Sequence, residues 1–103
     1  MAVIKVTTEN FAEEVLNASV PVLADFNAEW CGPCRMLGPT LEELSGESDA
    51  YKVVSINVDD EPDLAEQFGV SSIPCVVLFE GGQEKDRAVG LRPKESYREM
   101  LGL

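Results

Sequence analysis

Residues 22–34 read Val22-Leu23-Ala24-Asp25-Phe26-Asn27-Ala28-Glu29-Trp30-Cys31-Gly32-Pro33-Cys34. The first five positions form an almost continuous apolar run of strand length, which is typical of a central strand covered on both faces. This run leads to two cysteines that are separated by two residues. If a helix begins near Cys31, Cys31 and Cys34 lie one turn apart on one face, close enough to form a disulfide and to reopen it by exchange. The stretch therefore predicts a strand, a turn and a helix that begins with a reversible thiol pair.

The two thiols are expected to differ in their chemistry. Cys31 would lie beside the unpaired N–H groups of the first helical turn, where the positive end of the helix dipole favours a thiolate, the form that attacks. Cys34 lies one turn further in, so we expect it to be better shielded and to resolve a mixed disulfide between Cys31 and another protein. Pro33 fits this placement because proline is tolerated in a first helical turn.

Composition limits the class of protein. A chain of 103 residues with 45% hydrophobic residues and no linker-like run predicts a single domain over residues 1–103 with a substantial core. No apolar run has the length of a signal peptide or a membrane span, so we expect a soluble, cytoplasmic protein. Three cysteines are too few for a secreted disulfide framework, whereas the C-x-x-C spacing is typical of an intracellular redox pair.

The charge balance argues against a nucleic-acid partner. The chain has 8 basic and 19 acidic residues and no histidine, which gives a net charge of −11. The acidic residues are scattered and indicate solvated helix and loop faces that favour solubility, although a steering role for this charge is the alternative. They include Glu13, Glu14, Glu42, Glu43, 59–61 and Glu99.

Strand and helix patterns alternate along the rest of the chain. The expected further strands are Val3–Val6, Val53–Val58, Cys75–Phe79 and a last one around Arg87–Val89, entered through a Gly81-Gly82 hairpin. The expected helices follow Thr8-Glu9-Asn10 as far as Leu16, then cover about Cys31–Leu44 with a kink at Gly38-Pro39, Asp59–Phe68, and Pro93–Leu101. This order predicts a mixed sheet with helices on both faces, and the cysteines at the carboxyl end of a central strand.

Several separate stretches together resemble the thioredoxin family along essentially the whole chain. A bare C-x-x-C is common, but Trp-Cys-Gly-Pro-Cys combined with a distant Ile-Pro before an apolar strand is specific. The matching positions are Asp25-Phe26, Ala28 to Cys34, Pro39, Ile73-Pro74, Phe79, Gly82 and Val89-Gly90. The resemblance implies an α/β thioredoxin fold, with a central mixed five-stranded sheet flanked by four helices. It also implies a monomeric thiol-disulfide oxidoreductase without a resident cofactor, which reduces protein disulfides and is recycled by a thioredoxin reductase.

The resemblance assigns roles within the cysteine motif. Cys31 is implied to be the exposed nucleophile and Cys34 the buried resolving thiol. Gly32 and Pro33 are implied to tune how reducing the pair is. Trp30 is implied to belong to a flat apolar substrate surface, although an ordinary boundary aromatic would look the same in sequence.

The resemblance extends this surface to residues far from the motif. Pro74 is implied to be a cis proline packed against the cysteines, with the Ile73 backbone offering hydrogen bonds to an extended substrate; by itself, Pro74 is equally consistent with the start of an edge strand. Val89 and Gly90 are implied to complete the flat apolar surface, which suits many protein disulfides.

Asp25 is the charged residue within the apolar run, so burial is expected to raise its pKa. The family assigns this aspartate to deprotonating the resolving thiol, here Cys34, through water; the alternative is a strand-end carboxylate that reaches solvent. Two positions depart from the family pattern. Ser55 stands where a lysine commonly accompanies the aspartate, and Asn27 stands where an aromatic residue is frequent. Without the cationic partner, we expect the pKa of Asp25 to be well above its ordinary value.

Cys75 is a third departure, because threonine usually follows the cis proline in this family. Its neighbours Val76, Val77 and Leu78 favour a buried small hydrophobe, which is what a free cysteine usually is. The alternative is an accessory thiol that takes part in redox chemistry or is modified.

Two other classes of function fit the sequence less well. A structural zinc or iron–sulfur site needs about four cysteine or histidine ligands, and this chain has three cysteines and no histidine. A purely structural subunit of a larger assembly would not need the Cys31 and Cys34 thiols.

Overall fold

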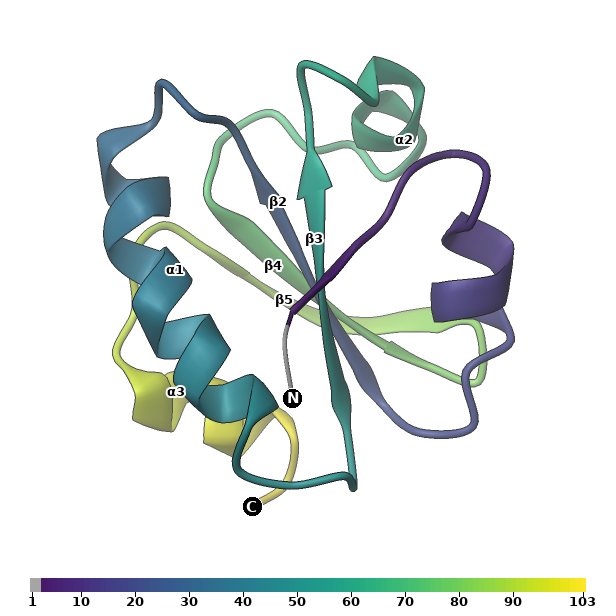
Figure 1. Ribbon diagram of the computed structural model, residues 1–103, viewed down its shortest axis with the longest axis vertical. Helices are drawn as coiled ribbons and strands as arrows, with labels where there is room; N and C mark the ends of the chain where they lie inside the picture. Colours follow the sequence, from purple (N-terminus) through teal and green to yellow (C-terminus); the bar gives the residue numbers. More distant parts are fainter. Residues whose placement is uncertain (1–2) are drawn as a thin grey trace.

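Five strands form one mixed sheet in the computed structural model, which describes residues 3–103 (Figure 1). The strands are β1 (Ile4–Lys5), β2 (Val22–Asn27), β3 (Lys52–Asn57), β4 (Cys75–Glu80) and β5 (Gln83–Val89), in the order β1-β3-β2-β4-β5. β3 pairs in parallel with β1 and β2, whereas β4 pairs antiparallel with β2 and β5. The predicted mixed sheet is confirmed, with a parallel half and an antiparallel half that meet at the central strand β2.

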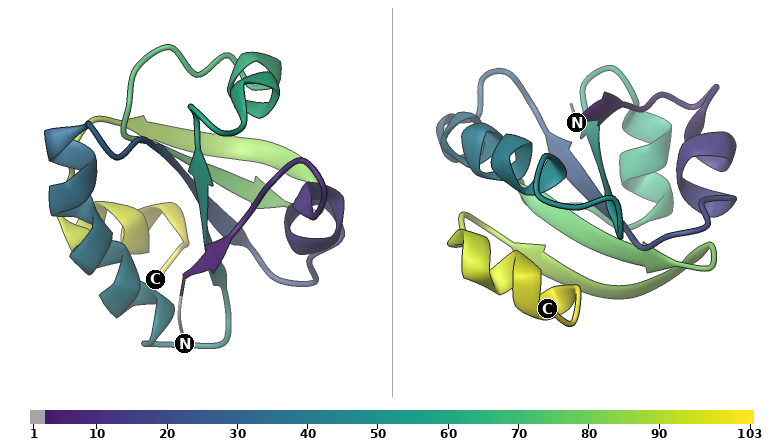
Figure 2. Two further views of the ribbon diagram at one scale, coloured as in Figure 1. Left: turned by 45° about the horizontal axis from the view of Figure 1, so that its top comes forward. Right: turned by 60° about the horizontal axis from the view of Figure 1, so that its bottom comes forward.

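The helices cover both faces of this sheet, as predicted (Figure 2). Helices α1 (Gly32–Ser45) and α3 (Lys94–Met100) lie on one face. A short π-helix, η1 (Ala12–Leu16), and α2 (Pro62–Gln67) lie on the other. Because successive side chains of a strand point to opposite faces, β2 supplies both cores. Leu23 packs with α1 and α3, and Ala24 packs with η1 and α2.

Two hydrophobic cores hold these layers together. Both consist of buried apolar side chains, and burying that area is the main favourable contribution to folding. The core under η1 and α2 includes Val6, Phe11, Val15, Phe26, Val54, Leu64, Val77 and Phe79. The core under α1 and α3 includes Leu37, Leu41, Leu44, Val53, Val76, Leu78 and Tyr97.

The two shortest helices differ from the predicted ranges. The helix expected to follow Asn10 is only five residues long and has π geometry, since Asn17 N–H donates to the Ala12 carbonyl at 2.9 Å. The helix expected over Asp59–Phe68 begins at Pro62 instead. The Asn57 side chain accepts hydrogen bonds from the N–H groups of residues 59 and 60, which holds that segment as a turn.

Strand boundaries also differ from the pattern. β1 covers only two residues, although Val6 N–H still donates to the Ser55 carbonyl at 2.8 Å. β3 begins and ends one residue earlier than predicted. β5 begins at Gln83, four residues before the predicted Arg87, and most of its side chains are polar and exposed. Residues 83–86 form part of the strand because they pair with β4 across the hairpin. The apolar pattern covers only the last residues of β5, so the predicted range was too short.

The longest helix passes through Gly38-Pro39, where a kink is predicted. Pro39 lies inside α1, and the helix continues from Gly32 to Ser45 as one element. The helix is long enough to keep Leu37, Leu41 and Leu44 on one buried face. Core packing therefore fixes α1 to the sheet.

The turn between β4 and β5 allows a prediction on stability. Gly81 and Gly82 have φ values of 60° and 80°, which residues with a Cβ atom rarely adopt. A Cβ on Gly82 would also lie 3.0 Å from the Leu16 carbonyl oxygen, whereas one on Gly81 would meet nothing within 4 Å. We expect Gly82→Ala to lower the free energy of unfolding by about 2–3 kcal/mol and Gly81→Ala by about 1 kcal/mol. Urea unfolding measures both, and equal losses would contradict the close approach to Leu16.

Candidate active site at the Cys31–Cys34 pair

The cysteine pair lies where β2 passes into α1. Cys31 is the N-cap residue of α1, with extended backbone angles, and Pro33 follows within the first turn. The Cα atoms of Cys31 and Cys34 are 5.2 Å apart, and the two sulfurs are joined in a disulfide. The Cys34 N–H donates to the Cys31 Sγ at 3.2 Å. The predicted position of Cys31 beside the free N–H groups of a helix start is confirmed.

The predicted difference in exposure between the two cysteines is wrong for this state. Cys31 is 5% exposed and Cys34 6% exposed, so neither is an open nucleophile in the disulfide form. Both pack in a small cluster with Ala28, against which Val58 and Ile73 also lie. Ile73, in the loop before β4, packs over the pair from the other side of the site.

That loop is held against the pair by the β4–β5 hairpin. The Ile73-Pro74 peptide bond is cis, as implied by the family resemblance. The Ile73 carbonyl oxygen lies 3.9 Å from the Cys31 Sγ. The Gly90 N–H donates to the Pro74 carbonyl at 2.8 Å, and Gly90 has a φ of 91°, which favours glycine. The structure thus brings residues 73–74 and 90 together with the cysteines.

Exposed apolar side chains accompany this site. Trp30 is 67% exposed, and its indole N–H donates to the Asp59 carboxylate at 2.8 Å. Val89, beside Gly90, is also exposed. Met36 and Leu91, for which the sequence predicts no role, are two further exposed apolar residues close in sequence to these. Met36 does not share the helical spacing of the buried residues of α1, and this spacing is the sequence feature that indicates its exposure.

Asp25 lies beneath the pair, on the α1 side of the sheet. Asp25 is 5% exposed, which excludes the alternative of a carboxylate that reaches solvent. Burial raises the pKa of Asp25 to about 6, against an ordinary value of 3.8, and a hydrogen bond from Asn27 partly opposes that rise. The predicted direction of the shift is confirmed.

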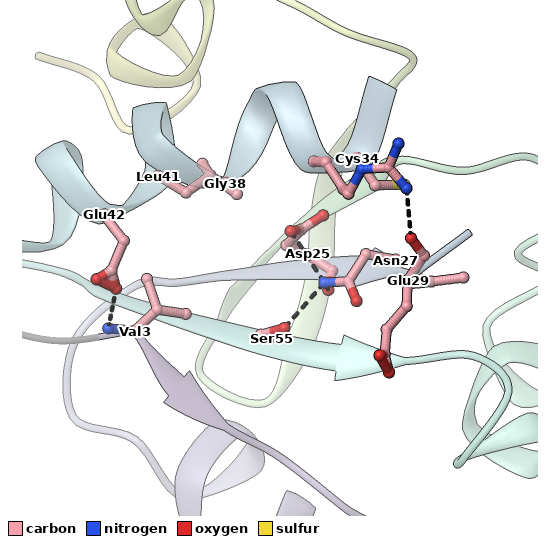
Figure 3. Close-up of a pocket in the computed structure, with 11 residues that line it drawn as sticks. Val3, Asp25, Asn27, Glu29, Cys34, Gly38, Leu41, Glu42 and Ser55 are labelled. Atoms are coloured by element: carbon pink, nitrogen blue, oxygen red, sulfur yellow. Dashed lines mark hydrogen bonds between the residues drawn. The ribbon is translucent and has the colours of Figure 1, made fainter. Parts of the chain in front are cut away.

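A cavity of about 370 Å³ joins Asp25 to Cys34 (Figure 3). Asp25 rises from β2 toward α1, where Cys34 lies, with Asn27 and Ser55 beside it. Apolar and small residues form much of the wall, and Glu29, Arg35 and Glu42 also line the cavity. The cavity is large enough to admit water between the carboxyl group and Cys34.

Cys75 is 1% exposed and belongs to the core under η1 and α2. Burial raises the pKa of its thiol, which disfavours the reactive thiolate. Its position in the fold therefore favours the small hydrophobe over the accessory thiol.

This burial leads to a prediction on thiol reactivity. In the reduced native protein, we expect iodoacetamide to label Cys75 at least about a hundredfold more slowly than Cys31, because labelling needs local opening of the core. Mass mapping of labelled peptides measures both rates, with guanidinium-unfolded protein as the control in which all three thiols react. Similar rates for Cys75 and Cys31 in the native protein would restore the accessory-thiol interpretation.

Within residues 3–103, no three histidine, cysteine, aspartate or glutamate side chains are grouped in a way that could hold a metal ion. None of the helices in that range combines the length and hydropathy needed to cross a membrane.

Comparisons with known proteins agree with this geometry. The family model described as Thioredoxin matches residues 2–102. The thioredoxin of Chlamydia caviae is 52% identical over 96 residues, covering 93% of this chain and 92% of that protein. The thioredoxin of Rickettsia bellii is 47% identical over 97 residues, again covering 93% and 92%.

A solved structure extends the match to three dimensions. A mutant thioredoxin from Halobacterium salinarum superposes with a TM-score of 0.89 at 35% identity, covering 97% of this chain and 88% of that one. With a Cys-x-x-Cys pair joined as a disulfide at the start of α1, this chain belongs to the thioredoxin family of thiol-disulfide oxidoreductases.

Proposed function

We propose that this protein reduces disulfides of other proteins, with Cys31 as the attacking thiol and Cys34 as the resolving thiol. The observation that carries this assignment is the N-cap position of Cys31. Its Sγ accepts the Cys34 N–H, and a sulfur in that position is stabilised as a thiolate by the start of α1. Cys34 lies within the helix and does not have this advantage.

The exchange takes place in two balanced steps. The Cys31 thiolate attacks one sulfur of the substrate disulfide, forming a mixed disulfide and releasing the other substrate sulfur as a thiolate that takes up a proton. The Cys34 thiol then loses its proton and attacks the Cys31 Sγ, which releases the second substrate sulfur. Two electrons pass to the substrate, and the protein is left with the Cys31–Cys34 disulfide seen in the structure.

Asp25 is the base that we assign to the second step. Its carboxyl lines the same cavity as Cys34, and a pKa of about 6 leaves it mostly ionised at neutral pH, yet able to accept a proton. The proton of the Cys34 thiol passes to Asp25, directly or through water, and the carboxyl returns it when the substrate thiolate leaves.

The substrate-binding surface in this proposal surrounds the pair. Trp30 and Val89 offer exposed apolar area, and the Ile73 backbone beside the Cys31 Sγ is the part that would hydrogen-bond an extended substrate segment. Pro74 and Gly90 are bonded to each other and hold this loop next to the pair. Gly32 and Pro33, between the two cysteines, tune the redox potential.

The partners and setting follow from this chemistry. Substrates are proteins that carry a disulfide, and a thioredoxin reductase, either an NADPH-dependent flavoprotein or a ferredoxin-linked one, returns two electrons to the pair. The proposed state is a monomer of one domain in the reducing cytoplasm, where a reductant of this kind is kept active. The net charge of −11 supports neither a nucleic-acid nor an anionic membrane partner.

Insulin reduction tests the proposal. Each candidate reductase is combined with wild-type protein, with Cys31→Ser, and with Cys75→Ala as the matched control for loss of a buried cysteine. We expect turnover with wild type and Cys75→Ala, and only the uncatalysed rate with Cys31→Ser. The proposal would be overturned if the wild type showed no turnover with both classes of reductase, or if Cys31→Ser were fully active.

A further inference from the structure

Three polar side chains form a small network under α1, on the otherwise apolar sheet. Asp25 of β2 is paired in register with Ser55 of β3, so the two side chains emerge next to each other on the same face. Asn27 lies two residues after Asp25 and therefore also points to that face. All three line the cavity that contains Cys34 (Figure 3).

The Asn27 amide connects the other two residues. Its Nδ2 donates to the Asp25 Oδ2 at 3.1 Å, to the Asp25 backbone carbonyl at 3.1 Å and to the Ser55 Oγ at 2.8 Å. The hydrogen bond to the Ser55 hydroxyl is the shortest of the three, and it orients the plane of the Asn27 amide. The second carboxyl oxygen, Oδ1, is buried and has no hydrogen-bond partner within the described part of the protein.

Other charged or titratable groups face Asp25 without pairing with it. Those lining the cavity are Glu29 before α1, and Cys34, Arg35 and Glu42 of α1; Cys75 of β4 and Tyr97 of α3 sense its charge from neighbouring elements. The Arg35 guanidinium donates to the Glu29 carbonyl at 2.8 Å. Burial raises the pKa of both Cys75 and Tyr97, so these two are uncharged at neutral pH. Among residues 3–103, no salt bridge includes Asp25.

We propose that Asn27, anchored by Ser55, is a positioning residue for the exchange reaction: it holds one oxygen of the Asp25 carboxyl and leaves the other oxygen free to take the Cys34 proton. This inference rests on the role given to Asp25 in the proposed function. In this inference, the neutral side chains of Asn27 and Ser55 orient the buried Asp25 carboxyl group, in a protein that lacks the lysine common at position 55 in the family.

The contact has a definite electrostatic effect. An N–H donated to a carboxylate favours the ionised form, whereas burial favours the neutral form. The Asn27 amide therefore keeps the pKa of Asp25 lower than burial alone would make it. Without the amide, Asp25 would remain protonated to higher pH and would be a poorer acceptor for the thiol proton near neutrality.

The test compares Asn27→Leu, which removes the amide and keeps the branched shape of the side chain, with wild type. The pKa of Asp25 is measured by carbon-13 NMR of its carboxyl group in the oxidised protein, in which Cys31 and Cys34 do not titrate. We expect it to rise by about one pH unit, because a hydrogen bond to a charged group is lost. The rate of the resolving step in insulin reduction falls as pH is lowered and Asp25 becomes protonated. In Asn27→Leu this fall should begin at a correspondingly higher pH than in wild type.

Three further variants separate this effect from general damage. Asn57→Leu is the matched control, since Asn57 is the register partner of Asn27 but its side chain bonds the turn after β3. It should leave the pKa of Asp25 unchanged. Ser55→Ala should raise that pKa by less than Asn27→Leu does, and Ser55→Thr, which keeps the hydroxyl, should restore the wild-type value. Ser55→Ala carries the test if Asn27→Leu does not fold.

The outcomes distinguish this inference from the proposed function. An unchanged pKa of Asp25 in both Asn27→Leu and Ser55→Ala overturns the inference, while insulin reduction through Cys31 would still stand. A raised pKa with an unchanged pH profile also overturns it and removes Asp25 from the reaction. The proposed function fails by a different result, the absence of insulin reduction by the wild type at any pH.

Discussion

Replacing Cys34 by serine is expected to stop the exchange halfway, with the substrate held on Cys31. The first step needs only the Cys31 thiolate, which the start of α1 still stabilises. The second step loses its intramolecular nucleophile, for which effective concentrations reach about 10⁵ M or more. Millimolar external thiol cannot replace it, so release of substrate should slow at least about a thousandfold. Non-reducing electrophoresis and mass spectrometry of the trapped adduct measure this.

The matched control is the double variant Cys31→Ser with Cys34→Ser, which should trap nothing. Cys75→Ala in the Cys34→Ser background should trap as much substrate as Cys34→Ser alone, because Cys75 is buried in the other core. An adduct that maps to Cys75, or full turnover by Cys34→Ser, would mean that the assignment of the two steps is wrong.

Replacing Asp25 by asparagine is expected to stabilise the oxidised protein in alkaline solution and not in acid. The pKa of Asp25 is about 6 in the folded protein against an ordinary 3.8, so the folded state disfavours the charge. That difference corresponds to about 3 kcal/mol. Between these two pKa values the folded state binds more protons than the unfolded state, so stability falls as pH rises through this window. We therefore expect a gain of about 3 kcal/mol at about pH 8 and almost none below pH 4.

Urea unfolding of the two oxidised proteins at several pH values measures this difference. Asp60→Asn removes an exposed aspartate from the turn before α2 and is the control for loss of a surface charge. A gain that is the same at all pH values would indicate better packing rather than relief of a buried charge. Asp25→Asn also removes the proposed base, so this stabilised variant should resolve mixed disulfides more slowly than wild type near neutral pH.

The parts of the fold that were predicted correctly depend on strong local signals. The apolar run of β2, the cysteine motif at the start of α1 and the glycine pair of the β4–β5 turn each indicate one structure over a short range. Their order then leaves few arrangements for the sheet. The family resemblance supplied the cis bond before Pro74, which spacing alone left open.

The parts that were missed depend on contacts between distant segments. β5 pairs along its full length because β4 lies beside it, although residues 83–86 have no apolar pattern. The contact of Asn27 with Ser55 depends on the parallel register of β2 and β3, which a single sequence does not contain. The equal burial of Cys31 and Cys34 depends on the loop at Ile73, far along the chain.

The polar outer strand β5 has a consequence for how the molecule behaves in crowded solution. Open sheet edges attract other strands and seed aggregation, and charged side chains on them oppose this. Here one edge, β1, is only two residues long, and the other carries Glu84, Lys85, Asp86 and Arg87 in succession. The two edges therefore give an unfolded or oxidised chain little to pair with, so such a chain is not recruited onto the sheet itself.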